Sequence, residues 1–145
     1  MTGRRILEAL PLIQATWPDI DLPTWRSFVK SFTAKHPASS SGALALLDGS
    51  GGLCGVLAYC QEFDLCEGPT LAVRLFSAVD LRNATAPARA LLDAAMEQAR
   101  RHGCHGIHIR LKPEQAALAR SIQSLGVSHA AGLYRIDLDP IGAPN

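Results

Sequence analysis

Residues 71–103 read LAVRLFSAVDLRNATAPARALLDAAMEQARRHG, and the hydrophobic pattern of this stretch changes period part-way along. Over residues 71–79, large apolar side chains alternate with smaller or charged ones, which predicts a strand. In this pattern Val73 and Leu75 share one face of the strand, and Phe76 adds bulk to the other. The change of period predicts that the strand leads into a helix.

The second part of the stretch has the pattern of an amphipathic helix. Apolar residues recur there at a spacing of three or four, and most charged residues fall between them. Thr85 is a candidate N-cap, Pro87 is tolerated in the first turn, and Gly103 is expected to end the helix. A strand that runs into a helix N-terminus aims several backbone N–H groups and the positive end of the helix dipole at one point. Such a point is suited to bind a phosphate or a diphosphate.

The composition of the whole chain excludes several kinds of partner. Its 145 residues suffice for one domain with a buried core, and we expect a single domain over residues 1–145. A net charge of +1, with scattered Lys and Arg and few aromatic residues, does not favour a nucleic-acid partner. Neither a secretory signal nor a membrane-spanning apolar run is recognisable. We therefore expect a cytoplasmic protein with reduced thiols and no membrane partner.

The cysteines and histidines do not predict a metal site. The spacing of the four cysteines matches no metal motif, so we interpret them as small apolar residues, mainly in strands. The segment HGCHGIH brings several candidate ligands together in sequence, but it crosses a helix end, a turn and a strand, so their side chains should diverge. The residues concerned are Cys54, Cys60 and Cys66, and in the segment His102, Cys104, His105 and His108.

The remaining elements favour an α/β (α+β) fold with a mixed, mostly antiparallel sheet flanked by helices. Three consecutive strands with short connections favour an antiparallel meander, and a helix between two strands makes that pair parallel and adjacent. The core is expected over residues 43–138. The expected elements are two N-terminal helices within residues 4–34, strands at 42–48, 53–63 and 71–79, a helix at 86–102, a strand at 106–111, a helix at 112–127, a strand at 132–138 and a tail at 139–145.

The order helix–helix–strand–strand–strand–helix–strand–helix–strand resembles the GNAT family of acyl-CoA N-acyltransferases over about residues 44–138. In that family the turn after the central strand carries the signature Arg/Gln-x-x-Gly-x-Gly/Ala, whose backbone amides hold the coenzyme A diphosphate. The next strand splays away and admits the pantetheine arm. Here the signature falls on residues 83–88, NATAPA, with alanine at both glycine positions and Pro87 in place of one amide. The family's Asn and Tyr positions fall on Gln115 and Ile122.

The resemblance implies an N-acetyltransferase that uses acetyl-CoA and a small-molecule or peptide amine as acceptor. A backbone amide near Val79 would support the oxyanion. The coenzyme-binding residues that the resemblance implies are Val79, Leu81, Arg82, Asn83, Ala84, Thr85, Ala86, Ala88, Arg89 and Gln115.

The sequence offers more than one candidate for the catalytic acid and base. His108, on the strand beside the expected splay, is a candidate base, and Tyr134 or Tyr59 is a candidate for the acid missing at Ile122; each is also an ordinary strand residue. A missing acid slows transfer without forbidding it, because a thiolate whose thiol pKa is about 8.5 can leave partly unassisted. The alternative is a catalytically silent GNAT-like module that binds a small ligand or a protein. An open edge on the C-terminal strand is compatible with a homodimer.

Overall fold

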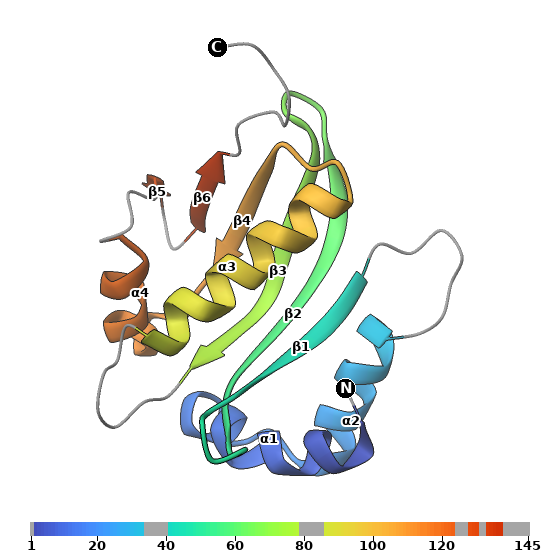
Figure 1. Cartoon of the computed structure of the whole chain (residues 1–145), viewed down its shortest axis with the longest axis vertical. Coiled ribbons are helices and arrows are strands. Elements are labelled where there is room, and N and C mark those ends of the chain that lie inside the picture. Colours follow the sequence, from blue (N-terminus) through green and yellow to red (C-terminus); the bar gives the residue numbers. More distant parts are fainter. Residues whose placement is uncertain (1, 34–40, 79–85, 124–127, 131–132, 138–145) are drawn as a thin grey trace.

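The computed structural model describes residues 2–33, 41–78, 86–123, 128–130 and 133–137 (Figure 1). The elements in chain order are α1 (Gly3–Thr16), α2 (Leu22–Thr33), β1 (Ser41–Leu47), β2 (Leu53–Asp64), β3 (Gly68–Ala78), α3 (Ala86–Arg101), β4 (Gly106–Arg110), the 3-10 helix η1 (Pro113–Gln115), α4 (Ala116–Gln123), β5 (Ser128–Ala130) and β6 (Leu133–Asp137).

Within the described residues, six strands form one mixed sheet in the order β1-β2-β3-β4-β6-β5. The β3–β4 pair is parallel, and the other neighbouring pairs are antiparallel. The expected fold class, the antiparallel meander and the parallel pair across α3 are therefore confirmed. Strand β5 was not predicted, because three residues are too few to show a period. Because β5 pairs with β6, the last long strand is not the edge on which the homodimer expectation rested.

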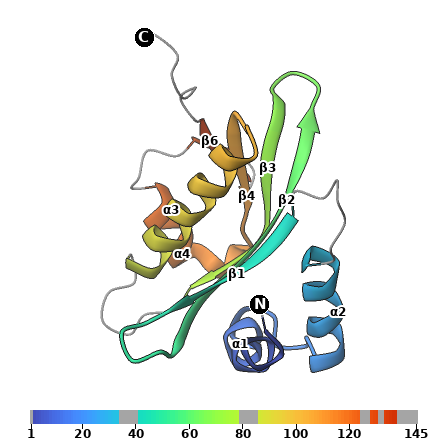
Figure 2. The same ribbon diagram turned by 45° about the vertical axis from the view of Figure 1, so that its right-hand side comes forward.

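Helices cover both faces of the sheet (Figure 2). On one face, α3 and α4 pack over a cluster that includes Leu57, Phe76, Leu91 and Ile107, all nearly or fully buried. The predicted apolar stripe of α3 lies against this cluster, as its spacing requires. On the other face, α1 and α2 cover a second cluster. The sheet is thus buried on both sides, and no helix among the described residues is long and apolar enough to cross a membrane.

Polar contacts fix the start of α2 and hold this helix against α1. The Asp21 carboxylate accepts a hydrogen bond from the Thr24 N–H at 2.8 Å, so Asp21 caps the start of α2. The indole N–H of Trp25 donates to the carbonyl of Ile6 in α1 at 2.7 Å. This bond satisfies the polar atom of a buried tryptophan and holds α2 against α1.

Strand β3 carries a β-bulge at Arg74. Its register with β2 shifts there and leaves Arg74 opposite no residue of β2. The extra residue changes the alternation of faces: Val73 and Phe76 pack under α3, whereas Leu75 packs against the N-terminal helices. The prediction that Val73 and Leu75 share a face was wrong, because the bulge interrupts the period of two on which it depended.

The C-terminal end of α3 confirms the role predicted for Gly103. This glycine has a φ of +66°, in the left-handed region that favours glycine. The Cys104 N–H donates to the Ala99 carbonyl at 2.8 Å, and the Gly103 N–H donates to the Arg100 carbonyl at 3.1 Å. These two bonds make a Schellman motif, which ends the helix and turns the chain into β4.

Within the described residues, the helix predicted over residues 112–127 is less regular than its pattern indicated. It begins as η1 and continues as α4, with Pro113 at the first position of η1. Proline is tolerated there because its missing N–H has no intrahelical partner at a helix start. Residues 124–127, at the predicted end of this helix, lie outside the described residues.

Candidate functional site

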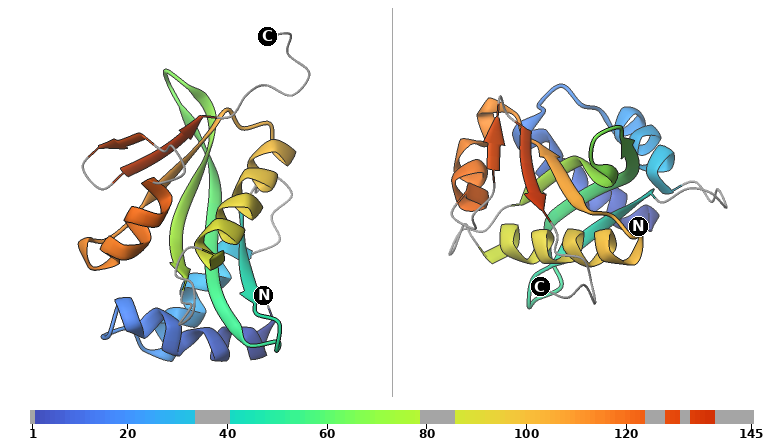
Figure 3. Two further views of the ribbon diagram at one scale, coloured as in Figure 1. Left: turned by 60° about the vertical axis from the view of Figure 1, so that its left-hand side comes forward. Right: turned by 90° about the horizontal axis from the view of Figure 1, so that it is seen from above.

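Strands β3 and β4 are paired over a short distance and then separate. Their last paired residues are Val73 and Ile109, but β3 continues to Ala78. The bulge at Arg74 lies where the pairing ends, and a bulge bends the strand that carries it. The edge of β3 from Arg74 to Ala78, about 16 Å long, is therefore not paired with β4. The two ribbons part toward the lower end of the sheet in the left view of Figure 3.

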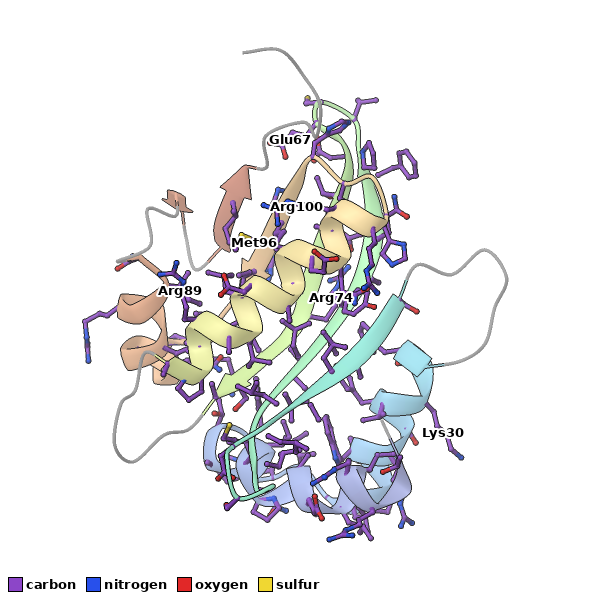
Figure 4. The ribbon with its side chains drawn as sticks, in the orientation of Figure 1. Lys30, Glu67, Arg74, Arg89, Met96 and Arg100 are labelled. Carbon is purple, nitrogen blue, oxygen red and sulfur yellow. The ribbon has the colours of Figure 1, made fainter. Side chains whose placement is uncertain are left out.

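The N-terminus of α3 follows β3 at this open end of the sheet. Ala86, the first residue of α3, is exposed. Ala88 also belongs to α3, but its side chain is buried in the core. Only the backbone N–H of Ala88 can therefore face a ligand. Arg89 is exposed (Figure 4), and its side chain lies 3.8 Å from the Asp93 carboxylate. The other implied residues of this turn, Val79, Leu81, Arg82, Asn83, Ala84 and Thr85, lie outside the described residues.

Gln115, which the resemblance implies for coenzyme binding, has a buried side chain that spans the gap between the separated segments. Its Nε2 donates to the Phe76 carbonyl at 2.7 Å, and its Oε1 accepts from the Lys112 N–H at 3.0 Å. The side chain is 7% exposed. Gln115 thus links the unpaired part of β3 to the segment that follows β4, at the level of Phe76.

None of the three positions considered for the catalytic acid places a described phenol at the gap. Ile122, at the family's Tyr position, is fully buried under α3. Tyr59 also lies under α3, where its hydroxyl donates to the Gln98 Oε1 at 3.1 Å and burial raises the pKa of the phenol. Tyr134 is paired with Ile109 in the β6–β4 ladder, and its side chain is outside the described part of the chain.

A cavity of about 420 Å³ opens on the face of the sheet that carries α1 and α2, beside the point where β3 and β4 part. We call it the basic cavity, because three cationic side chains and one carboxylate line it. Its lining residues are Trp17, Glu62, Ala72, Val73, Arg74, His108, Arg110, Leu111, Lys112 and Pro113.

Two contacts order the side chains of the basic cavity. Arg74, extruded at the bulge, forms an ion pair with Glu62 of β2. The Lys112 ammonium lies 5.5 Å from the ring centroid of Trp17, a cation–π contact that joins the β4–α4 connection to the end of α1. Within the described residues, neither Arg110 nor Lys112 forms an ion pair.

A smaller cavity of about 210 Å³ adjoins the basic cavity and shares Trp17 and Arg74 with it. We call it the apolar cavity, because its other walls are almost entirely hydrocarbon. These walls are Ile13, Ile20, Thr24, Trp25, Phe28 and Leu75. The aromatic side chains of α2, Trp25 and Phe28, therefore belong both to the core and to the cavity wall.

His108 lines the basic cavity, far along the sheet from Ala78, the last described residue of β3. Its Nε2 lies 3.2 Å from the carboxylate of Glu67, in the turn between β2 and β3 (Figure 4). His108 is level with Ala72, and Ala72 lies about 20 Å along β3 from Ala78. A histidine at this level cannot touch a thioester held beside Val79. Direct proton abstraction by His108 and oxyanion support near Val79 therefore do not fit one step.

The basic cavity could not have been found from sequence. Trp17, Glu62 and Arg74 are far apart in the chain and come from α1, β2 and β3. The sequence carries one signal for it: polar side chains alternate with apolar ones along β4, which puts His108 and Arg110 on the same face. Within the described residues, no group of three or more His, Cys, Asp or Glu side chains could hold a metal ion.

Comparisons with known proteins identify the architecture. No protein-family model matches this sequence, and no curated protein matches it by sequence. Among solved structures, the aminoglycoside N-acetyltransferase AAC(6')-Iy in complex with CoA is similar, with a TM-score of 0.70 over 90% of this chain and 86% of that one, at 15% identity. A Desulfovibrio desulfuricans protein assigned to the GNAT family of acetyltransferases has a TM-score of 0.69 over 94% of both chains, at 14% identity.

The chain has the GNAT fold. The ribosomal-protein-alanine N-acetyltransferase from Brucella melitensis biovar Abortus 2308 shares this fold, with a TM-score of 0.66 over 90% of both chains and 14% identity. The GNAT fold explains why β3 and β4 separate beside the start of α3, as the resemblance implied. At these identities the likeness shows the fold alone, so the activity must be argued from the residues of this chain.

Proposed function

We propose that this protein is an acetyl-CoA-dependent N-acetyltransferase that transfers an acetyl group to an amine. The observation that carries the proposal is the separation of β3 and β4 beside the N-terminus of α3. The basic cavity lies next to this separation, on the face of the sheet that carries α1 and α2. The free N–H groups and dipole of α3, at Ala86 and Ala88, would hold the diphosphate. The pantetheine arm would run along the unpaired edge of β3. CoA bound to the similar AAC(6')-Iy supports this choice of coenzyme.

The chemistry requires little from side chains. The amine nitrogen attacks the thioester carbon, the carbon–sulfur bond breaks, and coenzyme A leaves as a thiolate, which takes up a proton from the solvent. Backbone N–H groups of β3 just beyond the bulge, beside the basic cavity, would stabilise the oxyanion. The proton lost by the amine would pass into the basic cavity, where Glu62 and His108 are the titratable side chains.

A catalytically silent module with the same fold is the second candidate, and two observations favour it. Ile122 is fully buried where the family has its acid, and Gln115 already bonds the Phe76 carbonyl on the edge of β3. A pantetheine arm would have to pass this side chain or displace it. The module would then bind a ligand in the two cavities without transferring a group.

Calorimetric titration with acetyl-CoA and with free coenzyme A tests the coenzyme site. Micromolar binding of both is expected, followed by thiol release when amines are supplied. A folded protein that binds neither molecule would overturn the enzyme proposal and leave the silent module.

Ala86→Asp locates the coenzyme site. Ala86 is exposed, and a carboxylate in the first turn of a helix is compatible with the dipole, so the fold should persist. The same charge would face the diphosphate, and we expect coenzyme binding to be abolished. Ser27→Asp, at an exposed position of α2, is the control for added charge. Unchanged affinity in Ala86→Asp would place the coenzyme elsewhere.

A further inference from the structure

The linings of the two cavities differ in charge, and the difference describes the molecule that would fill them. In the basic cavity Glu62 is paired with Arg74, so this carboxylate is already neutralised by a cation. Arg110, the last residue of β4, and Lys112, just after the strand, remain. The other nearby carboxylate, Glu67, faces His108. The described side chains therefore leave positive charge directed at the cavity.

The apolar cavity has the opposite character. Trp17, Trp25 and Phe28 give it flat aromatic walls, and Arg74 is its one cationic lining residue among those described. Because Trp17 and Arg74 line both cavities, a single ligand can occupy the two at once. The apolar cavity has a volume of about 210 Å³, which is enough for one large apolar side chain and small for a carbohydrate ring system.

We infer that the two cavities bind one amine that also carries an anionic group, a carboxylate or a phosphoryl group, and a large apolar group. The anion lies between Arg110 and Lys112, and the apolar group packs on Trp17, Trp25 and Phe28. Arginine forms paired hydrogen bonds with either anion, and lysine adds a point charge. That such an amine accepts the acetyl group rests on the proposed function. That it binds in the two cavities does not, because a catalytically silent module would bind the same molecule. A polycationic amine such as an aminoglycoside is disfavoured by the same charges.

Tryptophan fluorescence measures binding to the cavities without any coenzyme. The chain has two tryptophans, and both line the apolar cavity. The probes are phenylalanine, its phosphonate analogue, phenylalaninamide, alanine and neamine. We expect phenylalanine or its phosphonate to bind about tenfold more tightly than phenylalaninamide, which lacks the anion, and than alanine, which lacks the apolar group. The stronger of the two anionic probes identifies the anion.

Arg110→Ala and Lys112→Gln test the residues. Each should weaken binding of the anionic probe about fivefold to tenfold and leave phenylalaninamide unchanged. Arg100→Ala, an exposed arginine on α3 across the sheet, should change neither affinity. Phenylalaninamide or neamine binding as tightly as the stronger anionic probe would overturn the inference. So would no quenching by any probe, or an affinity for the anionic probe that is unchanged in the Arg110 and Lys112 variants.

Thiol release from acetyl-CoA with the same amines separates this inference from the proposed function. Selective binding of phenylalanine without thiol release would support the inference and overturn the enzyme. Acetylation of neamine in preference to phenylalanine would support the enzyme and overturn the inference.

Discussion

At the residue scale, Gln115 shows how one polar side chain can stabilise the separation of β3 and β4 in this fold. It satisfies the Phe76 carbonyl, on the part of β3 that is not paired with β4, and the Lys112 N–H, just after the end of β4. A buried backbone group without a partner costs free energy, so the separation is stable in this chain because an amide replaces the missing ladder.

Gln115→Ala should therefore lower the free energy of unfolding. Two hydrogen bonds are lost at a buried site, and we expect a decrease of about 1–3 kcal/mol, measured by urea denaturation. Gln123→Ala, at an exposed position of α4, is the control and should change stability by less than about 0.5 kcal/mol. Equal stability of the two variants would show that the Gln115 amide is dispensable.

Tyr59 should make the free energy of unfolding depend on pH under alkaline conditions. Burial raises the pKa of this phenol above its ordinary value, and the charge of Arg101 offsets a smaller part of the shift. Because the folded pKa is the higher one, the contribution of Tyr59 is complete below the unfolded pKa of about 10 and is lost as pH rises through the folded pKa. Stability should fall more steeply above about pH 10 in the wild type than in Tyr59→Phe. Parallel curves for the two proteins would contradict this assignment.

At the element scale, the close packing of α3 on β2 depends on a glycine. A Cβ at Gly55 would lie 2.8 Å from the Leu91 Cδ1 and 3.3 Å from the Leu46 Cβ. Leu91 is 1% exposed, so its side chain has little room to move. Glycine at this position sets how near the helix approaches the sheet.

Gly55→Ala should overpack this contact and lower the free energy of unfolding by about 1–3 kcal/mol, measured by thermal or urea denaturation. Gly49→Ala is the matched control, because a Cβ there meets nothing within 4 Å and the φ of Gly49 is not in the left-handed region. If Gly55→Ala were as stable as the control, α3 would have to shift away from β2 at little cost.

At the scale of the whole molecule, the N-terminal helices are part of the core as well as the wall of both cavities. They cover Val56, Ala58 and Leu75, which are at most 5% exposed on that face of the sheet. The sheet cannot face water there, because its central strands carry apolar side chains on both sides.

Removal of residues 1–33 should expose this face and give a protein that aggregates and binds a hydrophobic dye. Size-exclusion chromatography and dye fluorescence measure both properties. The full chain is the reference. A truncated chain that stays monomeric with an unchanged circular dichroism spectrum would show that the α3 face alone supports the fold.

The amino-acid sequence by itself determined the type and order of most elements, because these depend on local periods and caps. The apolar spacing of α3, its stop at Gly103 and the parallel crossover to β4 all follow from residues near one another in the chain. The same local information led to the GNAT resemblance, and the fold bears it out.

Only the tertiary structure decided the bulge at Arg74, the bond of Gln115 across the gap, and the two cavities. Each depends on which strand lies beside which and where their register shifts, and these are pairings between distant parts of the chain. A one-residue shift reverses every side chain that follows it, so Leu75 and Phe76 exchanged faces although their own sequence pattern was regular. The alternation of side chains along a strand is a local property, but the face of the sheet that each side chain occupies is set by the pairing with neighbouring strands.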